Sequence, residues 1–292
     1  MEYILEAPKV FDKIIQIDKL CLPRNRKYTP EDIITIDLSN VCFIKPLGVI
    51  GVLLLVEYIT RIEVDKAPLV EIIPPKDDEV TDYLLRVNFI SALKTLTEWN
   101  IPKELKDSGR KLKPVIPITK FRNPQDIENI AHAMQEKFHS EFIGLTTLLQ
   151  PCHVVFSELA INAMEHANSN GGFVLAQQYD YIQGSMIEIA VGDCGIGISK
   201  SLKQKPQNKK LITSDRQAIT LVLSGGLSRI NDPYRGYGLN HVKEELIHAP
   251  DRSLTIRSGN GYAILGTGDR PYSANCKYFP GTLAHAVIPC SS

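Results

Sequence analysis

The chain has 292 residues, 43% of them hydrophobic and 23% charged, so it can bury the core of one large domain or of two smaller ones. Its 33 basic residues balance 33 acidic ones, which excludes a global field that would draw it to nucleic acid or to an anionic membrane. The longest apolar run, residues 41–56, is interrupted by Lys45 and Pro46 and is too short to span a bilayer, so we expect no membrane segment.

The cysteines and the amino terminus indicate the compartment. The six cysteines are scattered with no CxxC pair, and the first residues, MEYILEAPKVFDK, lack the basic start and apolar stretch of a secretory signal. We therefore expect reduced thiols and a cytoplasmic protein.

The first third of the chain predicts alternating strands and helices. Residues 33–39 alternate apolar and polar side chains with many β-branched residues, as a strand does. Residues 49–63 are apolar on all sides, as in a buried helix. Residues 69–75 predict a short strand ended by two prolines, and residues 78–96 have the apolar spacing of a helix.

Composition changes between residues 99 and 123, where three spaced prolines and many lysines precede Asn123 and Pro124. We place a domain boundary here and predict domains at residues 1–110 and 120–292. The alternative is that this segment is a connector or an edge strand in a single larger unit.

The rest of the chain also mixes helices and strands, so we predict the α/β (α+β) class. A polar stretch follows the glycine-rich turn after residue 193 and continues to residue 235. Helices are expected at 124–144, 146–167 and 239–249, and strands at 171–180, 185–193, 254–259, 262–266 and 283–289.

One polar pair lies on the helix predicted at 146–167. Glu158 and Asn162 are four residues apart and therefore project from the same face. A carboxylate beside an amide suits two tasks, the oxygen ligation of Mg²⁺ and the orientation of a water molecule. Taken alone, the pair is better explained as surface decoration of an amphipathic helix.

Two glycine-containing segments follow. Asp193 ends a strand and is followed by Gly195 and Gly197, so its carboxylate can accept a hydrogen bond from an exocyclic amine while the backbone approaches a flat ring. The alternative is an ordinary Asp-Gly turn. Further along, Arg235, Gly236 and Gly238 precede a helix. Backbone amides at the start of a helix and an arginine side chain beside them can bind a phosphate group.

In this order the three segments resemble the N, G1 and G2 boxes of the GHKL (Bergerat-fold) ATPase and kinase superfamily. That superfamily includes gyrase-type ATPases, mismatch-repair ATPases, sensor histidine kinases and anti-sigma-factor serine kinases. Gly281 and Thr282 resemble its last box, and residues 253–265 are similar to its central hairpin. The resemblance covers more than half of the chain and implies a Bergerat-type α/β sandwich with a mixed sheet.

The resemblance also implies roles, with ATP and Mg²⁺ as cofactors. Asn162 would ligate Mg²⁺, Glu158 would be the general base, and Asp193 would bind the adenine amino group. Gly195 and Gly197 would let the ring approach. The residues at the phosphates would be Arg235, Gly236 and Gly238, with Thr282 near the adenine. Tyr234 stands where the first glycine of the G2 box often falls, and residues 199–234, with lysines at their start, would form the lid.

The first domain bears a weaker resemblance, carried by residues 34–55 and 80–93, to the STAS domain of anti-sigma-factor antagonists. Lys45, Pro46 and Leu47 occupy the places of its phosphoacceptor turn. The resemblance therefore implies a docking or dimerising module that is not itself phosphorylated. The alternative is an unrelated α/β segment packed on the second domain.

These resemblances imply a Mg-ATP protein that hydrolyses ATP or uses it as a switch and signals through its STAS-like domain to a protein partner. The alternatives are a serine/threonine kinase of the anti-sigma-factor type and a non-catalytic nucleotide-binding scaffold. A sensor histidine kinase is disfavoured, because one long helix precedes the N box and His132 and His139 lie in no acceptor motif. A homodimer fits the family, and neither nucleic acid nor membrane is expected.

Overall fold

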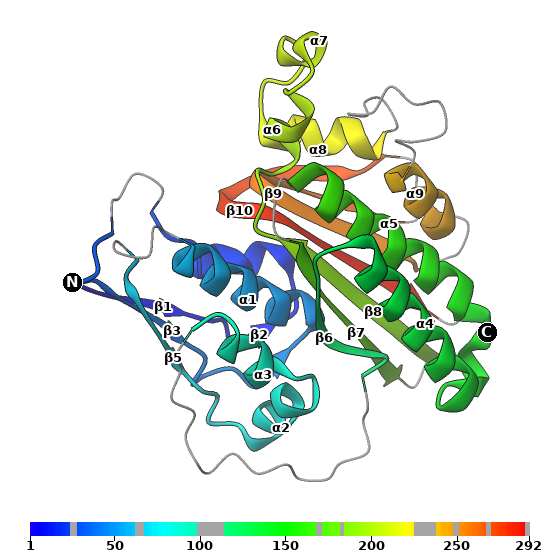
Figure 1. Ribbon diagram of the computed structural model, residues 1–292, viewed down its shortest axis with the longest axis horizontal. Coiled ribbons are helices and arrows are strands. Elements are labelled where there is room, and N and C mark those ends of the chain that lie inside the picture. The colour runs from blue at the N-terminus through cyan, green and yellow to red at the C-terminus, as the bar shows by residue number, and fades with distance from the viewer. Residues whose placement is uncertain are drawn as a thin grey trace.

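The computed structural model describes residues 1–23, 28–61, 67–97, 114–167, 171–181, 184–224, 238–247, 251–266 and 270–289 (Figure 1). In this part of the chain, helices accompany a three-stranded, a five-stranded and a two-stranded sheet, which confirms the α/β class. Parallel pairings occur in the two smaller sheets, and all four pairings of the five-stranded sheet are antiparallel. The two kinds of pairing are thus divided between sheets.

The amino-terminal unit is built on a parallel sheet in the order β1-β3-β5. Its strands are β1 (Glu2–Glu6), β3 (Ile33–Asp37) and β5 (Leu69–Ile73), so the strands predicted in residues 33–39 and 69–75 are confirmed. The short strands β2 (Val10–Phe11) and β4 (Phe43–Ile44) pair beside it, and a 3-10 helix, η1 (Ile14–Lys19), follows β2.

Helix α1 (Pro46–Thr60) is the predicted buried helix, and nearly all of its residues are buried. Pro46 at its first turn has no N–H to leave unpaired, so the helix begins there. The helix packs on β5 of its own unit and on β7, β8 and β10 of the five-stranded sheet. One apolar core therefore continues from Ile34 through Leu53 to Leu283.

The single helix predicted at residues 78–96 is wrong: the chain forms α2 (Asp78–Arg86) and α3 (Phe89–Lys94). Between them Asn88 adopts φ 65°, a left-handed conformation that asparagine tolerates better than most residues. The carbonyl of Val87 accepts a hydrogen bond of 2.9 Å from Ile118 N in the second sheet. The hydrogen bond to Ile118 thus occupies the Val87 carbonyl, which a continuous helix would need for its own backbone hydrogen bond.

The second sheet has the order β6-β7-β8-β10-β9. Its strands are β6 (Ile116–Phe121), β7 (Gly172–Tyr181), β8 (Gly184–Asp193), β9 (Ser253–Leu265) and β10 (Tyr272–Pro289). One face packs on α4 (Pro124–Ser140), α5 (Leu149–Ala167) and α9 (Gly238–Ile247), and α1 covers the other face (Figure 1). The 3-10 helix η2 (Ile143–Leu148) packs on α4 and α5. Edge strand β6 begins at Ile116, inside the segment where we expected the domain boundary.

The expected hairpin in residues 253–265 is also wrong, because these residues form one continuous strand, β9. Gly259 has φ 59°, and the pairing with β10 shifts register on either side of Phe279. The extra residues at both shifts lie on β10, so β10 bulges while β9 continues without turning back. The amide of Asn260 donates to Asp215 Oδ2 at 2.7 Å. A neighbouring helix thus takes the hydrogen bond that a turn would have used.

The described part of the predicted lid is helical. It contains α6 (Ile198–Leu202), α7 (Pro206–Lys209) and α8 (Asp215–Leu223), and α8 packs on β9. In Figure 1, α7 lies at the tip of a projection above the sheet. Among the helices described, none combines the length and apolarity needed to cross a bilayer.

Candidate functional site

The alternation of side chains along β8 decides which way Asp193 points. Ile189 and Val191 belong to the core beneath α4 and α5, whereas Ala190 belongs to the core around α1. A Cβ placed on Gly192 would lie 2.4 Å from Leu54 Cδ1 of α1. Because successive residues of a strand face opposite sides, Asp193 lies on the face that α5 covers. The structure therefore brings Asp193 to the same side of the sheet as the helix that carries Glu158 and Asn162.

Asp193 ends a row of residues that runs across the sheet. It pairs with Gly172 of β7 on one side and with Thr282 of β10 on the other, and Thr282 pairs with Ser258 of β9. Side chains aligned across strands share one face. The other three residues of the row are small. A Cβ placed on Gly172 would lie 2.8 Å from Phe121 Cζ, so the Phe121 ring covers that end of the row, and Thr282 and Ser258 lie on the other side of the carboxylate.

Ser258 was not predicted as a site residue, and its hydroxyl links β9 to the start of α6 and to the turn at Gly281. Its Oγ accepts a 3.0 Å hydrogen bond from Ile198 N and donates a 2.8 Å bond to the carbonyl oxygen of Gly281. Thr282 Oγ1 lies 3.4 Å from the same hydroxyl. Only the register of β9 against β10 places Ser258 here, and no sequence motif gives that register.

The turn at Gly281 depends on glycine. Its φ is 68°, and a Cβ there would lie 1.9 Å from the carbonyl oxygen of Asp193. We expect Gly281→Ala to lower the free energy of unfolding by about 2–4 kcal/mol, because it adds both backbone strain and a clash with backbone. Urea denaturation measures this. Gly144→Ala is the control, since nothing lies within 4 Å of a Cβ there, and equal losses in the two variants would refute the argument.

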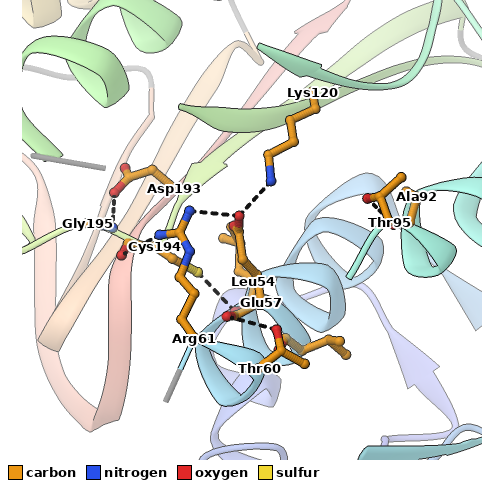
Figure 2. A network of polar contacts seen from close by, with 11 residues as sticks. Leu54, Glu57, Thr60, Arg61, Ala92, Thr95, Lys120, Asp193, Cys194 and Gly195 are labelled. Atoms are coloured by element: carbon orange, nitrogen blue, oxygen red, sulfur yellow. Dashed lines mark hydrogen bonds and ion pairs between the residues drawn. The ribbon is translucent and has the colours of Figure 1, made fainter. Parts of the chain in front are cut away.

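The carboxyl of Asp193 is 3% exposed, and this burial raises its pKa to about 7. The amide of Gly195, at 2.7 Å from Oδ1, lowers the pKa, the charge of Glu57 raises it, and Arg61 and the amide of Thr282 lower it (Figure 2). A ligand that donates an N–H to the carboxylate would replace part of the lost hydration. Asp193 is therefore suited to bind an amino group.

Glu158 and Asn162 lie on α5 as the spacing predicted. Asn162 Nδ2 donates to the backbone oxygen of Glu158 at 2.7 Å, so the amide oxygen is the atom directed away from the helix. Glu158 Oε1 lies 3.1 Å from His241 Nδ1 of α9. Glu158 and His241 line an open cleft of about 300 Å³ between α5 and α9, and Asn162 is not part of its lining. His241 was not predicted as a site residue, because only the packing of α9 on α5 brings it to Glu158.

The predicted site residues that the structure describes form two groups, one at the end of β8 around Asp193 and one on the neighbouring helices α5 and α9. Gly195 and Gly197 follow Asp193 directly, and Thr282 lies beside it at the sheet end. Gly238 is the first residue of α9, which packs on α5. Arg235 and Gly236 lie outside the described residues, so their predicted contact with phosphate stays a prediction.

The donors present fit a nucleotide with Mg²⁺. Within the described ranges, no cluster of three or more histidine, cysteine, aspartate or glutamate side chains could hold a metal ion by itself. Mg²⁺ in nucleotide sites commonly takes one or two protein oxygens and completes its shell with phosphates and water. Asn162 Oδ1 would be the protein ligand in such a site.

Comparisons of the chain with protein-family models, with curated proteins and with solved structures find no match. The assignment of this site therefore depends on its own geometry.

Proposed function

We propose that residues 120–292 bind ATP with Mg²⁺ in a GHKL-type pocket, and that the protein hydrolyses ATP or uses it as a conformational switch. The pocket would lie between α5, the end of β8 and the start of α9. One observation carries this proposal: Asp193 is buried on the α5 face of the sheet, beside a row of three small residues. A buried carboxylate beside the small side chains of Thr282 and Ser258 suits the amino edge of adenine.

Each residue has a defined task in this proposal. When bound, Mg-ATP would supply the γ-phosphoryl group, and the Mg²⁺ ion would neutralise part of the negative charge on the phosphate oxygens. Asp193 accepts a hydrogen bond from the adenine amino group, and Asn162 offers Oδ1 to the metal. Glu158 would take a proton from the water that attacks the γ-phosphorus, while the bond from that phosphorus to the bridging oxygen breaks and ADP leaves. His241 Nδ1, 3.1 Å from Glu158 Oε1, would hold the carboxylate of Glu158 in place.

The amino-terminal unit is proposed to transmit nucleotide state to a protein partner. Helix α1 is buried between two sheets, so the partner must bind elsewhere. The outer face of the parallel sheet carries the exposed apolar side chains of Ile4, Leu69 and Ile73 and is the surface we propose for it. Lys45, at the place of the STAS phosphoacceptor turn, pairs with Glu188 at 2.5 Å, which supports a docking module over a phosphorylated one.

We keep the cytoplasm as the proposed compartment. Cys21, Cys42, Cys152, Cys194 and Cys276 are all free thiols, as a reducing compartment favours.

The alternative function is a protein serine/threonine kinase. Glu158 is a quarter exposed and lies on the wall of an open cleft, so a protein hydroxyl would have access to it. In that case Glu158 would take the proton of the hydroxyl in place of that of water.

Incubation with γ-labelled ATP and Mg²⁺, alone and with cell extract, separates these functions. Labelled free phosphate is the result expected of hydrolysis, and a labelled protein band is the result expected of a kinase. Tight binding without either product would identify a nucleotide-binding scaffold. Absence of binding would refute all three.

A further inference from the structure

Helix α1 runs along β8 and is fixed to it at both ends. At its start, Lys45 Nζ lies 2.5 Å from Glu188 Oε1. At its end, Arg61 Nη1 donates to the carbonyl oxygen of Cys194 at 3.5 Å. Between these points Ile50 and Leu54 pack so closely on Gly192 that no side chain fits there. A helix of the amino-terminal unit thus sets the position of the strand that ends in Asp193.

Glu57 is the centre of a buried charge network at the end of α1 (Figure 2). It is 2% exposed, and its Oε1 accepts hydrogen bonds from Arg61 Nη2 at 2.9 Å and from Lys120 Nζ at 2.7 Å. Its Oε2 is buried without a hydrogen-bond partner among the described residues. An apolar side chain would avoid this desolvation cost, so packing stability alone does not account for the network.

The residue after Asp193 is also held by α1. Cys194 Sγ donates to the carbonyl oxygen of Leu54 at 3.0 Å, and burial raises the pKa of this thiol, which keeps its proton available for that bond. Gly192 and Cys194, the two neighbours of Asp193, therefore both contact α1. Asp193 itself points to the opposite face, towards α5.

We propose that Glu57 and Arg61 are positioning residues through which the amino-terminal unit sets the affinity of the nucleotide site. This inference rests on the proposed function, because it concerns the same site. A partner that displaces α1 moves the turn at Asp193 and changes the charges around it. The signal from one unit to the other then needs no contact between the partner and the nucleotide.

The two positioning residues act on Asp193 with opposite signs. The negative charge of Glu57 raises the pKa of Asp193, and the positive charge of Arg61 lowers it. Lys120 faces Glu57 and offsets part of its charge, and the remaining polar groups at the carboxyl are the amides of Gly195 and Thr282. Removing one charge or the other must therefore move the titration of Asp193 in opposite directions.

The test measures the Kd for Mg-ATP from pH 5.5 to 8.5 with the full chain and three variants. Because the amino group needs the ionised carboxylate, wild-type affinity should rise about tenfold from pH 6 to pH 8, with a midpoint near the pKa of about 7. Glu57→Gln should shift this midpoint down and Arg61→Gln should shift it up, each by about half a pH unit or more. Arg86→Gln is the matched control, since it removes another i,i+4 ion pair, with Asp82 at 3.0 Å, and should leave the midpoint unchanged.

Carbon NMR of the Asp193 carboxyl without nucleotide gives the same titration independently. Opposite shifts in both measurements support the proposal. Shifts of equal sign, or none, would overturn it, because a structural role alone moves both variants alike. If wild-type protein binds no Mg-ATP, the proposed function fails and the control of nucleotide affinity fails with it. Opposite NMR shifts would then still show that α1 acts on Asp193.

Discussion

Asp193→Asn is expected to stabilise the fold at pH 8 and to weaken the binding of ATP at least about tenfold. Burial raises the pKa of this carboxyl from 3.8 to about 7, so the folded protein holds a proton that the unfolded chain has released between these values. The stability contributed by Asp193 is therefore full below pH 3.8 and is lost as the pH rises through 7. Asparagine carries no charge and keeps an oxygen for the amide of Gly195. We expect a gain of about 2–4 kcal/mol at pH 8, measured by urea denaturation.

The pH dependence identifies the cause of this gain. The difference in unfolding free energy between the variant and the wild type should shrink as the pH falls from 8 to 5. Asp180→Asn is the control, because Asp180 is exposed at the other end of the β7–β8 pair and should change stability by less than about 0.5 kcal/mol. A variant that is less stable than wild type at pH 8 would show that the charge of Asp193 is not a cost to the fold.

The second large effect is expected on α5, where binding and turnover should separate. Glu158→Gln removes the base but keeps the shape of the side chain, so turnover should fall about 10²–10⁴-fold with little change in Kd. Asn162→Ala removes the proposed metal ligand, so Mg-ATP affinity should fall roughly tenfold to hundredfold, while ADP without Mg²⁺ should bind nearly as before. Steady-state phosphate release and calorimetry measure the two quantities.

The control is Glu136→Gln, which changes an exposed carboxylate on the neighbouring helix α4. This variant should alter neither the turnover nor the affinity for Mg-ATP. If Glu158→Gln left phosphate release unchanged, another group would have to be the base. Equal loss of Mg-ATP and metal-free ADP binding in Asn162→Ala would indicate a packing role for the amide.

Local sequence patterns predicted those parts of the fold that local chemistry decides. The apolar side chains on every side of residues 49–60 predicted α1, because burial against two sheets requires them. The predictions at residues 78–96 and 253–265 were wrong because distant groups decide those segments. Ile118 takes a carbonyl at the break between α2 and α3, and Asp215 takes an amide in the middle of β9.

The candidate site also has features that local sequence decides and features that distant segments decide. The i,i+4 spacing of Glu158 and Asn162 and the end of the strand at Asp193 could be predicted, because each is a property of one element. Ser258 depends on a register between two strands, and His241 on the packing of α9 against α5. Glu57 looks like a lone acid in an apolar helix, and its partner Lys120 lies 63 residues away. No pattern in a single segment contains that information.

The central claim is that Asp193 recognises the amino group of adenine in a magnesium-dependent nucleotide site. Calorimetric titration of the wild-type chain with Mg-ATP and with Mg-ITP, whose base lacks that amino group, tests it most directly. We predict saturable binding of ATP, at least about tenfold weaker binding of ITP, and loss of this preference in Asp193→Asn. Equal heats with the two nucleotides, or no heat with either, would contradict the claim.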